Sequence, residues 1–283
     1  MSFTLLGILN SQAAGLVIVS VAGYFSQSNG GNTAVYKYAF PSDTVTTTTA
    51  SPAGMNRNAG FADSNVAGYF SAGSSTTTVY KWAFPADTVT TTTAAPASLN
   101  YHAGFANAAV AGYFSRSGST TTVYKWAFPA DTVTTTTAAP TNMGNNGGFS
   151  NPAVAGYFSE SNNLPNVYKW AFPSDTVTTT TAAPASMNRN AGFANPAVAG
   201  YFSKGLVTTV YKWAFPSDTV TTTTGSAAGM EYHAGFSNPA VAGYFSRSDG
   251  FTTVYKWAFP SDTRSTTTAA PAAMGNNAGF ADA

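Results

Sequence analysis

The stretch Ala111-Gly-Tyr-Phe-Ser115, followed by Tyr124-Lys-Trp-Ala-Phe-Pro-Ala-Asp131 and the threonine run Thr134–Thr137, is copied six times along the chain. The glycines of the six Gly-Tyr-Phe motifs recur every 43–45 residues, at Gly23, Gly68, Gly112, Gly156, Gly200 and Gly243. A period of this length, sustained over most of the 283 residues, is typical of repeat architectures. The repeat therefore decides the fold class before any local feature does.

Each copy contains four short segments with strand character and no helical periodicity beyond a turn. In the third copy these segments are 103–107, 110–115, 123–128 and 133–137. The third segment alternates Val, Lys and Ala with Tyr, Trp and Phe, which is the pattern of a strand with two different faces. The intervening Phe-Pro-Ala-Asp has turn chemistry, because Pro fixes φ and Asp can bond its own backbone.

Four strands per copy, six copies and no helix predict an all-β, six-bladed β-propeller with four antiparallel strands per blade. We expect the aromatic face of each third strand (Tyr124, Trp126 and Phe128 in the third copy) to pack on the small-residue face of the next blade. Tyr38 takes the place of Trp in the first copy.

Seven segments of the sequence could form the first strand of a blade, whereas six blades need only six. The two competing segments lie at the ends of the chain. The segment Ala14–Ala22 aligns with the first strand but is much more apolar, and the chain stops directly after Ala278-Gly-Phe-Ala-Asp282. We expect the C-terminal copy to close the ring by strand exchange between the termini, with the N-terminal segment displaced. Pairing of 15–19 beside 21–26 as the inner strand would make this expectation wrong.

The repeats predict a single domain over residues 1–283. Residues 1–13 precede the repeats, residues 278–283 form the closing strand, and the copies begin near 20, 65, 109, 153, 197 and 240. The apolar patch at the start follows no Lys or Arg, so we do not expect a secretory signal.

Composition excludes several function classes. Charged residues are 8% of the chain and the net charge is +1, so no overall field attracts nucleic acid or an acidic membrane surface. No apolar stretch is long enough to span a membrane as a helix. The absence of cysteine excludes disulfides and thiolate chemistry. We expect no nucleic-acid partner, no membrane insertion and no cofactor, and we favour a monomer.

The order of segments, read from the third, is a Val-Tyr strand, a Pro-x-x-Asp-like turn, an outer strand, a proline, an Ala-Gly-Phe strand and a Gly-Tyr-Phe strand. This order resembles the kelch repeat in all six copies. The kelch diglycine is replaced by Ser115 and its equivalents, and the kelch tryptophan of the outer strand is absent. The chain is similar to kelch-like repeat proteins that phages and marine microbes encode. The resemblance implies a binding platform, in a virion or the host cytoplasm if the chain is phage-encoded.

Two charged positions recur in every copy. The lysines lie on the third segments and the aspartates in the turns, at Lys37, Lys81, Lys125, Lys169, Lys212, Lys256, Asp43, Asp87, Asp131, Asp175, Asp218 and Asp262. We interpret them as turn formers and structural ion pairs. The alternative is a ring of carboxylates that binds a metal, and we expect no metal site.

Two stretches differ between copies. One is the loop after Gly-Tyr-Phe-Ser, at 27–33, 72–76, 116–120, 160–166, 204–207 and 247–251. The other precedes Ala-Gly-Phe and holds the candidate ligand-binding residues Arg57, Asn58, Tyr101, His102, Asn145, Asn146, Arg189, Asn190, Tyr232, His233, Asn276 and Asn277. In an up-and-down blade both stretches lie on one face, around the mouth of the central channel. Loops on a rigid scaffold often carry binding residues.

The candidate residues repeat every three blades, which places equivalent residues on opposite sides of a six-bladed ring. We therefore expect Arg57 to face Arg189 and His102 to face His233. The period indicates that a three-blade unit was doubled, in evolution or by design, and the irregular loops favour a natural chain. Tyr, Arg, His and Asn suit recognition of a sugar. The alternative is that they only satisfy strand-end backbone groups and solvate a channel.

Enzyme chemistry is not expected. Two histidines on opposite sides cannot both bind one zinc ion at ~2.0–2.1 Å. A copper oxidase of the galactose-oxidase kind needs a Cys-linked Tyr, and a sialidase needs paired acids, whereas the chain has no Cys and two glutamates. Glu231 precedes His233, but Asn100 takes that place before His102, so no serine triad is indicated. The expected function is a non-catalytic, virion-associated binding propeller for a glycan or a protein surface; the alternative is a purely structural scaffold.

Overall fold

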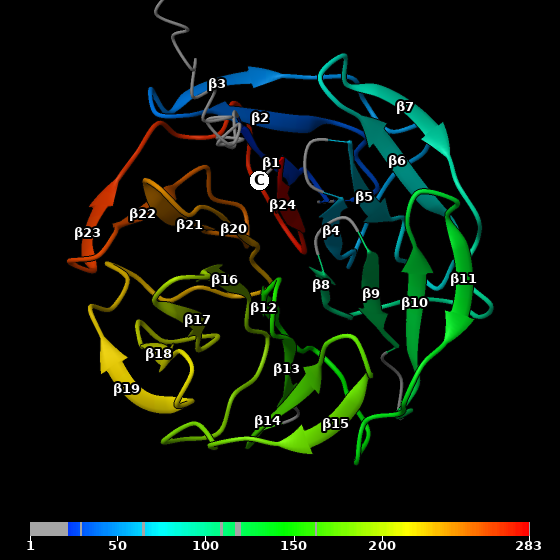
Figure 1. The fold of residues 1–283 in the computed structure, drawn as a ribbon. Coiled ribbons are helices and arrows are strands. Elements are labelled where there is room, and N and C mark those ends of the chain that lie inside the picture. Colours follow the sequence, from blue (N-terminus) through cyan, green and yellow to red (C-terminus); the bar gives the residue numbers. More distant parts are fainter. Residues whose placement is uncertain are drawn as a thin grey trace, which may run out of the picture.

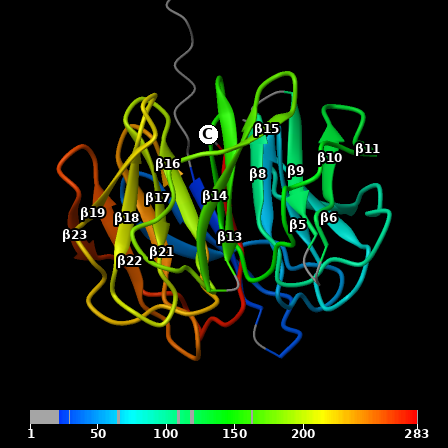
Figure 2. The same ribbon diagram turned by 90° about the horizontal axis from the view of Figure 1, so that it is seen from below.

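The computed structural model describes residues 22–282, apart from 29, 64–65, 108–109, 117–119 and 162. The described chain forms six four-stranded antiparallel sheets, which surround a central axis as blades (Figure 1). Figure 2 shows the blades standing side by side, with their strands running between the two faces of the ring. The predicted six-bladed propeller is confirmed. In the described residues no helix is long and apolar enough to cross a membrane.

Each blade contains one strand of each of four kinds, ordered from the axis outward. The inner strands are β24 (Gly279–Ala281), β4 (Gly60–Asp63), β8 (Gly104–Asn107), β12 (Gly148–Asn151), β16 (Gly192–Asn195) and β20 (Gly235–Asn238). The second strands are β1 (Ala22–Ser26), β5 (Ala67–Ser71), β9 (Ala111–Ser115), β13 (Ala155–Ser161), β17 (Ala199–Ser203) and β21 (Ala242–Ser246). The third strands are β2 (Val35–Ala39), β6 (Val79–Ala83), β10 (Val123–Ala127), β14 (Leu164–Ala171), β18 (Val210–Ala214) and β22 (Val254–Ala258). The outer strands are β3 (Thr44–Thr47), β7 (Thr88–Thr91), β11 (Thr132–Thr135), β15 (Thr176–Thr179), β19 (Thr219–Thr223) and β23 (Thr263–Thr266).

The C-terminal copy of the first strand closes the ring, as predicted. β24 pairs with β1 so that Gly279 lies opposite Phe25, and Gly60 lies opposite Phe70 in the same register of the second blade. The closing strand thus occupies the position that an uninterrupted copy fills elsewhere. The predicted displacement of the N-terminal segment lies outside the described residues.

Neighbouring blades meet where a phenylalanine fills the gap left by a glycine. Phe61 on β4 lies over Gly112 on β9, where an added Cβ would come within 2.0 Å of the ring. Gly112 pairs with Trp126 across β9 and β10, so the phenylalanine lies beside the large indole. The contact recurs at Phe236–Gly23, Phe280–Gly68, Phe61–Gly112, Phe105–Gly156, Phe149–Gly200 and Phe193–Gly243. Since such a close approach leaves no room for a side chain, this position requires glycine.

The aromatic face of each third strand meets the preceding blade, so the predicted direction was wrong. Tyr124 and Trp126 on β10 share a buried cluster with Ala67 and Val79 of the preceding blade. Trp126 Nε1 also donates to the carbonyl of Thr93 in that blade at 3.2 Å. The alternation in the sequence defines two faces of a strand, but the handedness of the ring decides which neighbour each face meets.

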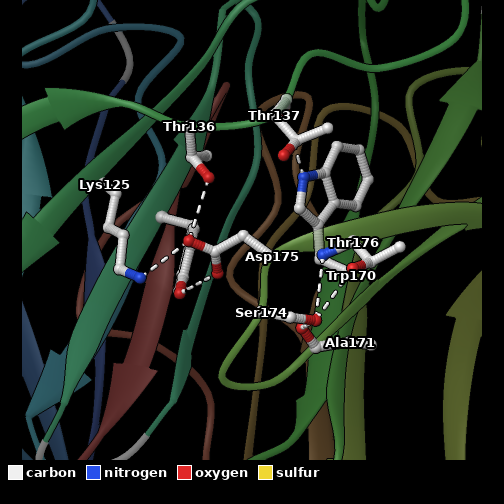
Figure 3. Close-up of polar contacts among 9 residues, drawn as sticks. Lys125, Thr136, Thr137, Trp170, Ala171, Ser174, Asp175 and Thr176 are labelled. Carbon is white, nitrogen blue, oxygen red and sulfur yellow. Dashed lines mark hydrogen bonds and ion pairs between the residues drawn. The ribbon is translucent and has the colours of Figure 1, made fainter.

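The other face of each blade binds the turn aspartate of the next blade through hydrogen bonds. Asp175 accepts hydrogen bonds from Tyr113 (2.7 Å), Lys125 (2.7 Å) and Thr136 (3.0 Å), all in the preceding blade. Figure 3 shows Lys125 and Thr136 pointing at this carboxylate. Burial and the bond to Asp175 raise the pKa of Tyr113, so its phenol remains a donor.

An ion pair joins each blade to the next, with Nζ–Oδ2 distances of 2.7–2.8 Å. The six pairs are Lys37–Asp87, Lys81–Asp131, Lys125–Asp175, Lys169–Asp218, Lys212–Asp262 and Lys256–Asp43. The last pair joins the sixth blade to the first, so side chains as well as strands close the ring. The six aspartates have φ of 54–56°, which short polar residues tolerate in turns. The predicted turn formers and structural ion pairs are confirmed.

Tyr38 makes the junction between the sixth and first blades different. In the other five blades the equivalent tryptophan donates its indole N–H to a threonine carbonyl of the preceding blade. The hydroxyl of Tyr38 is buried, and it has no hydrogen-bond partner in the described part of the chain. This junction therefore lacks a hydrogen bond that the other five make.

Candidate functional site

The two variable stretches lie side by side on one face of the ring, which we call the loop face. Backbone bridges join the loop after a second strand to the stretch that leads to the next inner strand, as between Thr76 and Leu99 and between Phe251 and Met274. Both stretches therefore lie at the same end of the blades, where the residues before the inner strands line one cavity.

Six residues, each three positions before the first residue of an inner strand, form what we call the outer layer of the channel mouth. They are Arg57, Tyr101, Asn145, Arg189, Tyr232 and Asn276, and all six have φ of 46–55°. A left-handed backbone costs a residue other than glycine roughly 1–3 kcal/mol and persists only where its surroundings fix it. Backbone bonds between blades supply part of that support, because Tyr101 N–H donates to the carbonyl of Arg57 and Asn145 N–H to that of Tyr101.

Four outer-layer side chains form a continuous stack across the mouth, which we call the mouth stack. The rings of Tyr101 and Tyr232, three blades apart, have centroids 5.6 Å from each other. The guanidinium of Arg57 lies 4.2 Å from the Tyr101 centroid, and that of Arg189 lies 4.5 Å from the Tyr232 centroid. Burial raises the pKa of Tyr232, and the two guanidinium charges oppose this shift. The three-blade period thus brings opposite sides of the ring into contact.

The neighbouring residues form the inner layer, made of Asn58, His102, Asn146, Asn190, His233 and Asn277, all buried. Each binds the serine of the Gly-Tyr-Phe-Ser motif in the preceding blade, as Asn146 Nδ2 does with Ser115 (2.9 Å) and His102 Nε2 with Ser71 (2.7 Å). The serine in turn accepts a backbone N–H, as Ser71 does from Ala59 at 3.0 Å. These residues therefore link neighbouring blades at the mouth.

The pairing of Ser71 with His102 brings together two groups found in nucleophilic catalysis. Ser71 is fully buried, and His102 Nδ1 has no hydrogen-bond partner among the described residues. Burial lowers the pKa of His102 to about 3, which makes it a weak base at neutral pH. His233 has the same pKa shift and binds Ser203. The geometry accounts for both histidines as hydrogen-bonding residues between blades.

Both glutamates of the chain have partners. Glu160 is buried and accepts hydrogen bonds from Tyr168 (2.6 Å) and Asn166 (2.7 Å) in the hairpin of β13 and β14. Glu231 forms an ion pair with Arg189 at the mouth. Across the axis Asn100 takes the place of Glu231, and Arg57 has no carboxylate partner among the described residues, whereas Arg189 has one.

Among the described residues of the loop face, the exposed large apolar side chains lie on one half. Leu164, Leu206, Val207 and Phe251 are 44%, 56%, 38% and 40% exposed and lie in the hairpins formed by the second and third strands of three consecutive blades, the fourth to the sixth. We call these residues the apolar rim. The guanidinium of Arg247 lies 3.3 Å from the centroid of Phe251. In the first three blades the corresponding loops consist mainly of Gly, Ser, Asn and Thr.

The channel is narrow at the mouth and wider at the other end. The twelve residues of the two layers line a cavity of about 40 Å³. At the far end of the inner strands, small residues such as Ala62 and Ser150 line a cavity of about 260 Å³, together with Pro152, Pro196 and Pro239. The mouth therefore has room for a few water-sized groups, since one water needs about 10–15 Å³.

All twelve predicted residues thus gather around the mouth, but in two layers with different partners. The outer layer forms the stack, and the inner layer binds serines that the sequence presented as scaffold. The apolar rim, the far cavity and the Arg189–Glu231 pair were not predicted. The loop residues Leu164, Leu206 and Phe251 were the available signal for the rim, because large apolar side chains are unusual in short polar loops.

Comparison with known proteins adds no family assignment. No family model matches the chain, and no curated protein matches it. Among the described residues, no three His, Cys, Asp or Glu side chains gather in a group suited to a metal ion.

Proposed function

We propose that this propeller is a non-catalytic recognition module that binds glycans at the loop face, over the mouth stack. The observation that carries the proposal is the pair of partly exposed tyrosine rings, Tyr101 and Tyr232, each covered by an arginine. The exposed edges and hydroxyls of the two tyrosines, with the neighbouring guanidinium and amide groups, can contact a sugar and bind its hydroxyls. Because the mouth cavity is small, the sugar lies on the stack rather than inside the channel.

A non-catalytic role is supported by the partners of the reactive groups. His102 and His233 bind buried serines, and the six turn aspartates hold lysines between blades. Glu160 and Glu231 likewise have partners. These groups contribute to the ring itself, which leaves the mouth stack and the loops for recognition.

A glycan array tests the proposal with the wild type and the double variant Tyr101→Asn/Tyr232→Asn. Asparagine is the matched replacement, because Asn145 and Asn276 occupy the equivalent positions at φ of 51° and 48°. We expect the wild type to bind a subset of glycans and the variant to lose that binding. An array on which the wild type binds nothing, or on which both proteins bind alike, would contradict the proposal.

A protein partner is the second candidate, and the apolar rim favours it. Exposed Leu206 and Phe251 would be buried by a partner, and apolar side chains at the centre of an interface often supply most of its affinity. Recognition of a protein surface predicts that Leu206→Ser/Phe251→Ser abolishes partner binding without changing the thermal unfolding temperature. A rim variant that binds the same partner equally well would contradict this candidate.

We further propose that the chain is a kelch-like protein of the phage-encoded kind, associated with a virion. The support is the order of segments in each copy, which resembles the kelch repeat. Mass spectrometry of purified particles from a phage that encodes the chain tests this placement. Absence of the protein from the particles would contradict virion association. A purely structural scaffold is the alternative, and it predicts wild-type assembly for the double variant Tyr101→Asn/Tyr232→Asn.

A further inference from the structure

The two halves of the channel mouth are nearly identical and differ in one charged residue. Residues 57, 101 and 102 are Arg, Tyr and His, and residues 189, 232 and 233 repeat them three blades away. The position before the tyrosine is Asn100 in one half and Glu231 in the other. The second half therefore serves as an internal comparison for the first.

Glu231 completes its half of the mouth. Its carboxylate pairs with Arg189, whose guanidinium also stacks on Tyr232. The pair shows where a carboxylate binds in this half of the mouth: beside the tyrosine and against the guanidinium. Charge-assisted hydrogen bonds of this kind are stronger than neutral ones.

The equivalent place beside Arg57 is unfilled. Arg57 stacks on Tyr101, but its guanidinium has no ion pair in the described part of the chain, and its buried Nε has no hydrogen-bond partner there. Asn100 is one methylene shorter than glutamate, and its side-chain oxygen is likewise without a partner among the described residues. Both Arg57 and Asn100 are partly exposed, so a group from solvent can reach them.

We infer that Arg57 and Asn100 form a binding site for the carboxylate of an acidic sugar, with the ring of that sugar on the mouth stack. The inference rests on the proposed glycan function and names the class of glycan. The carboxylate occupies the place that Glu231 fills on the opposite side. Arg57 supplies the charge, and the amide NH2 of Asn100 can donate a second hydrogen bond after the permitted amide rotation.

The test uses uronic-acid oligosaccharides and the same oligosaccharides with each carboxyl reduced to CH2OH, titrated into the full chain. We expect the wild type to bind the acidic form at least about tenfold more tightly than the reduced form, since a hydrogen bond to a charged group contributes about 1.5–3 kcal/mol. Asn100→Glu fills the site from within, as Glu231 does, and should remove this preference. Arg57→Gln should remove it as well.

Glu231→Asn provides the reciprocal variant, because it empties the second half of the mouth. NMR of the arginine Nε–H groups during titration with glucuronate should show Arg57 shifting in the wild type, both Arg57 and Arg189 in Glu231→Asn, and neither in Asn100→Glu. Methyl glucoside, the neutral control, should shift none of them. Thermal unfolding of each variant checks that the ring is intact.

Equal binding of the acidic oligosaccharide by the wild type and Asn100→Glu would overturn the carboxylate site. Equal binding of the acidic and reduced oligosaccharides would also overturn it, while leaving the proposed glycan function standing. If the wild type binds neither oligosaccharide and no other glycan on the array, both proposals are overturned.

Discussion

The junctions between blades and the channel mouth are built from the same repeat, but they use it in opposite ways. At every junction the same groups recur, a phenylalanine over a glycine and a lysine paired with an aspartate. At the mouth equivalent positions hold Arg, Tyr or Asn, and residues from opposite sides meet, as Tyr101 and Tyr232 do. Sixfold identity indicates residues that build the ring, and departure from it indicates residues that are free to serve recognition.

The inner layer shows where this division needs refinement. Its residues vary between Asn and His, yet all bind the serine of the preceding blade. Both side chains offer a nitrogen at the right distance, so the sequence can vary without loss of the contact. Variation alone therefore does not identify a binding residue, and the partners of the side chain must decide.

The largest expected effect is at the junctions, for Gly112→Ala. Because the new Cβ would lie 2.0 Å from the ring of Phe61, the ring and its blade must shift, and we expect a loss of about 3 kcal/mol in the free energy of unfolding. Equilibrium unfolding in denaturant measures the change. Thr134→Ala, on the exposed outer strand, is the control and should change stability by about 0.5 kcal/mol or less. Similar losses of unfolding free energy in both variants would contradict the claim that the junctions stabilise the ring more than the surface does.

The second prediction concerns acid sensitivity of the inner layer. The pKa of His102 and of His233 is lowered by burial to about 3, and the unfolded value is about 6.5. The unfolded chain therefore binds more protons between these values, so stability is full above pH 6.5 and falls as the pH drops toward 3. Each histidine can cost at most about 1.4 kcal/mol per pH unit in this window.

His102→Asn/His233→Asn is the matched control, because four blades already have asparagine in the inner layer. Urea unfolding at pH 7 and pH 5 should show a larger loss of stability in the wild type than in this variant. Equal losses would mean that the histidines do not titrate in the folded ring as their burial predicts.

The smallest predicted effect concerns the one irregular junction. Tyr38→Trp would give the first blade the residue that the other five use, with Thr268 in the position to accept from the indole N–H. We expect a gain of about 1 kcal/mol in the free energy of unfolding, the typical contribution of one hydrogen bond. Tyr38→Phe, which removes the buried hydroxyl without adding a donor, is the control. Loss of stability in Tyr38→Trp would show that this junction differs in more than one hydrogen bond.

Much of the fold could be predicted from the sequence because each feature was repeated six times. The strands, the turns and the lysine–aspartate pairs follow from alternation and turn chemistry, and the extra Ala-Gly-Phe segment at residues 278–280 predicted the closing strand. The direction in which Trp126 packs could not be predicted, because alternation describes two faces of a strand without assigning them to neighbours.

The candidate site was predicted as a set of residues but not as an arrangement. The three-blade period placed Tyr101 and Tyr232 on opposite sides, whereas their contact depends on the width of the channel and on φ values that sequence patterns do not give. The bond between His102 and Ser71 could not be predicted either, because the invariant serine gave no sign of a partner. Functional inferences from repeats therefore depend on side-chain contacts as well as on variation.

The central claim is that the mouth serves recognition while the junctions hold the ring. A single protein tests it, in which residues 57, 101, 102, 189, 232 and 233 are all replaced by asparagine so that every blade carries the Asn-Asn pair of the first and fourth blades. At pH 7 we predict cooperative unfolding with a free energy within about 2 kcal/mol of the wild type, and loss of glycan binding on the array. A ring that fails to fold, or one that still binds the wild-type glycans, would contradict the account.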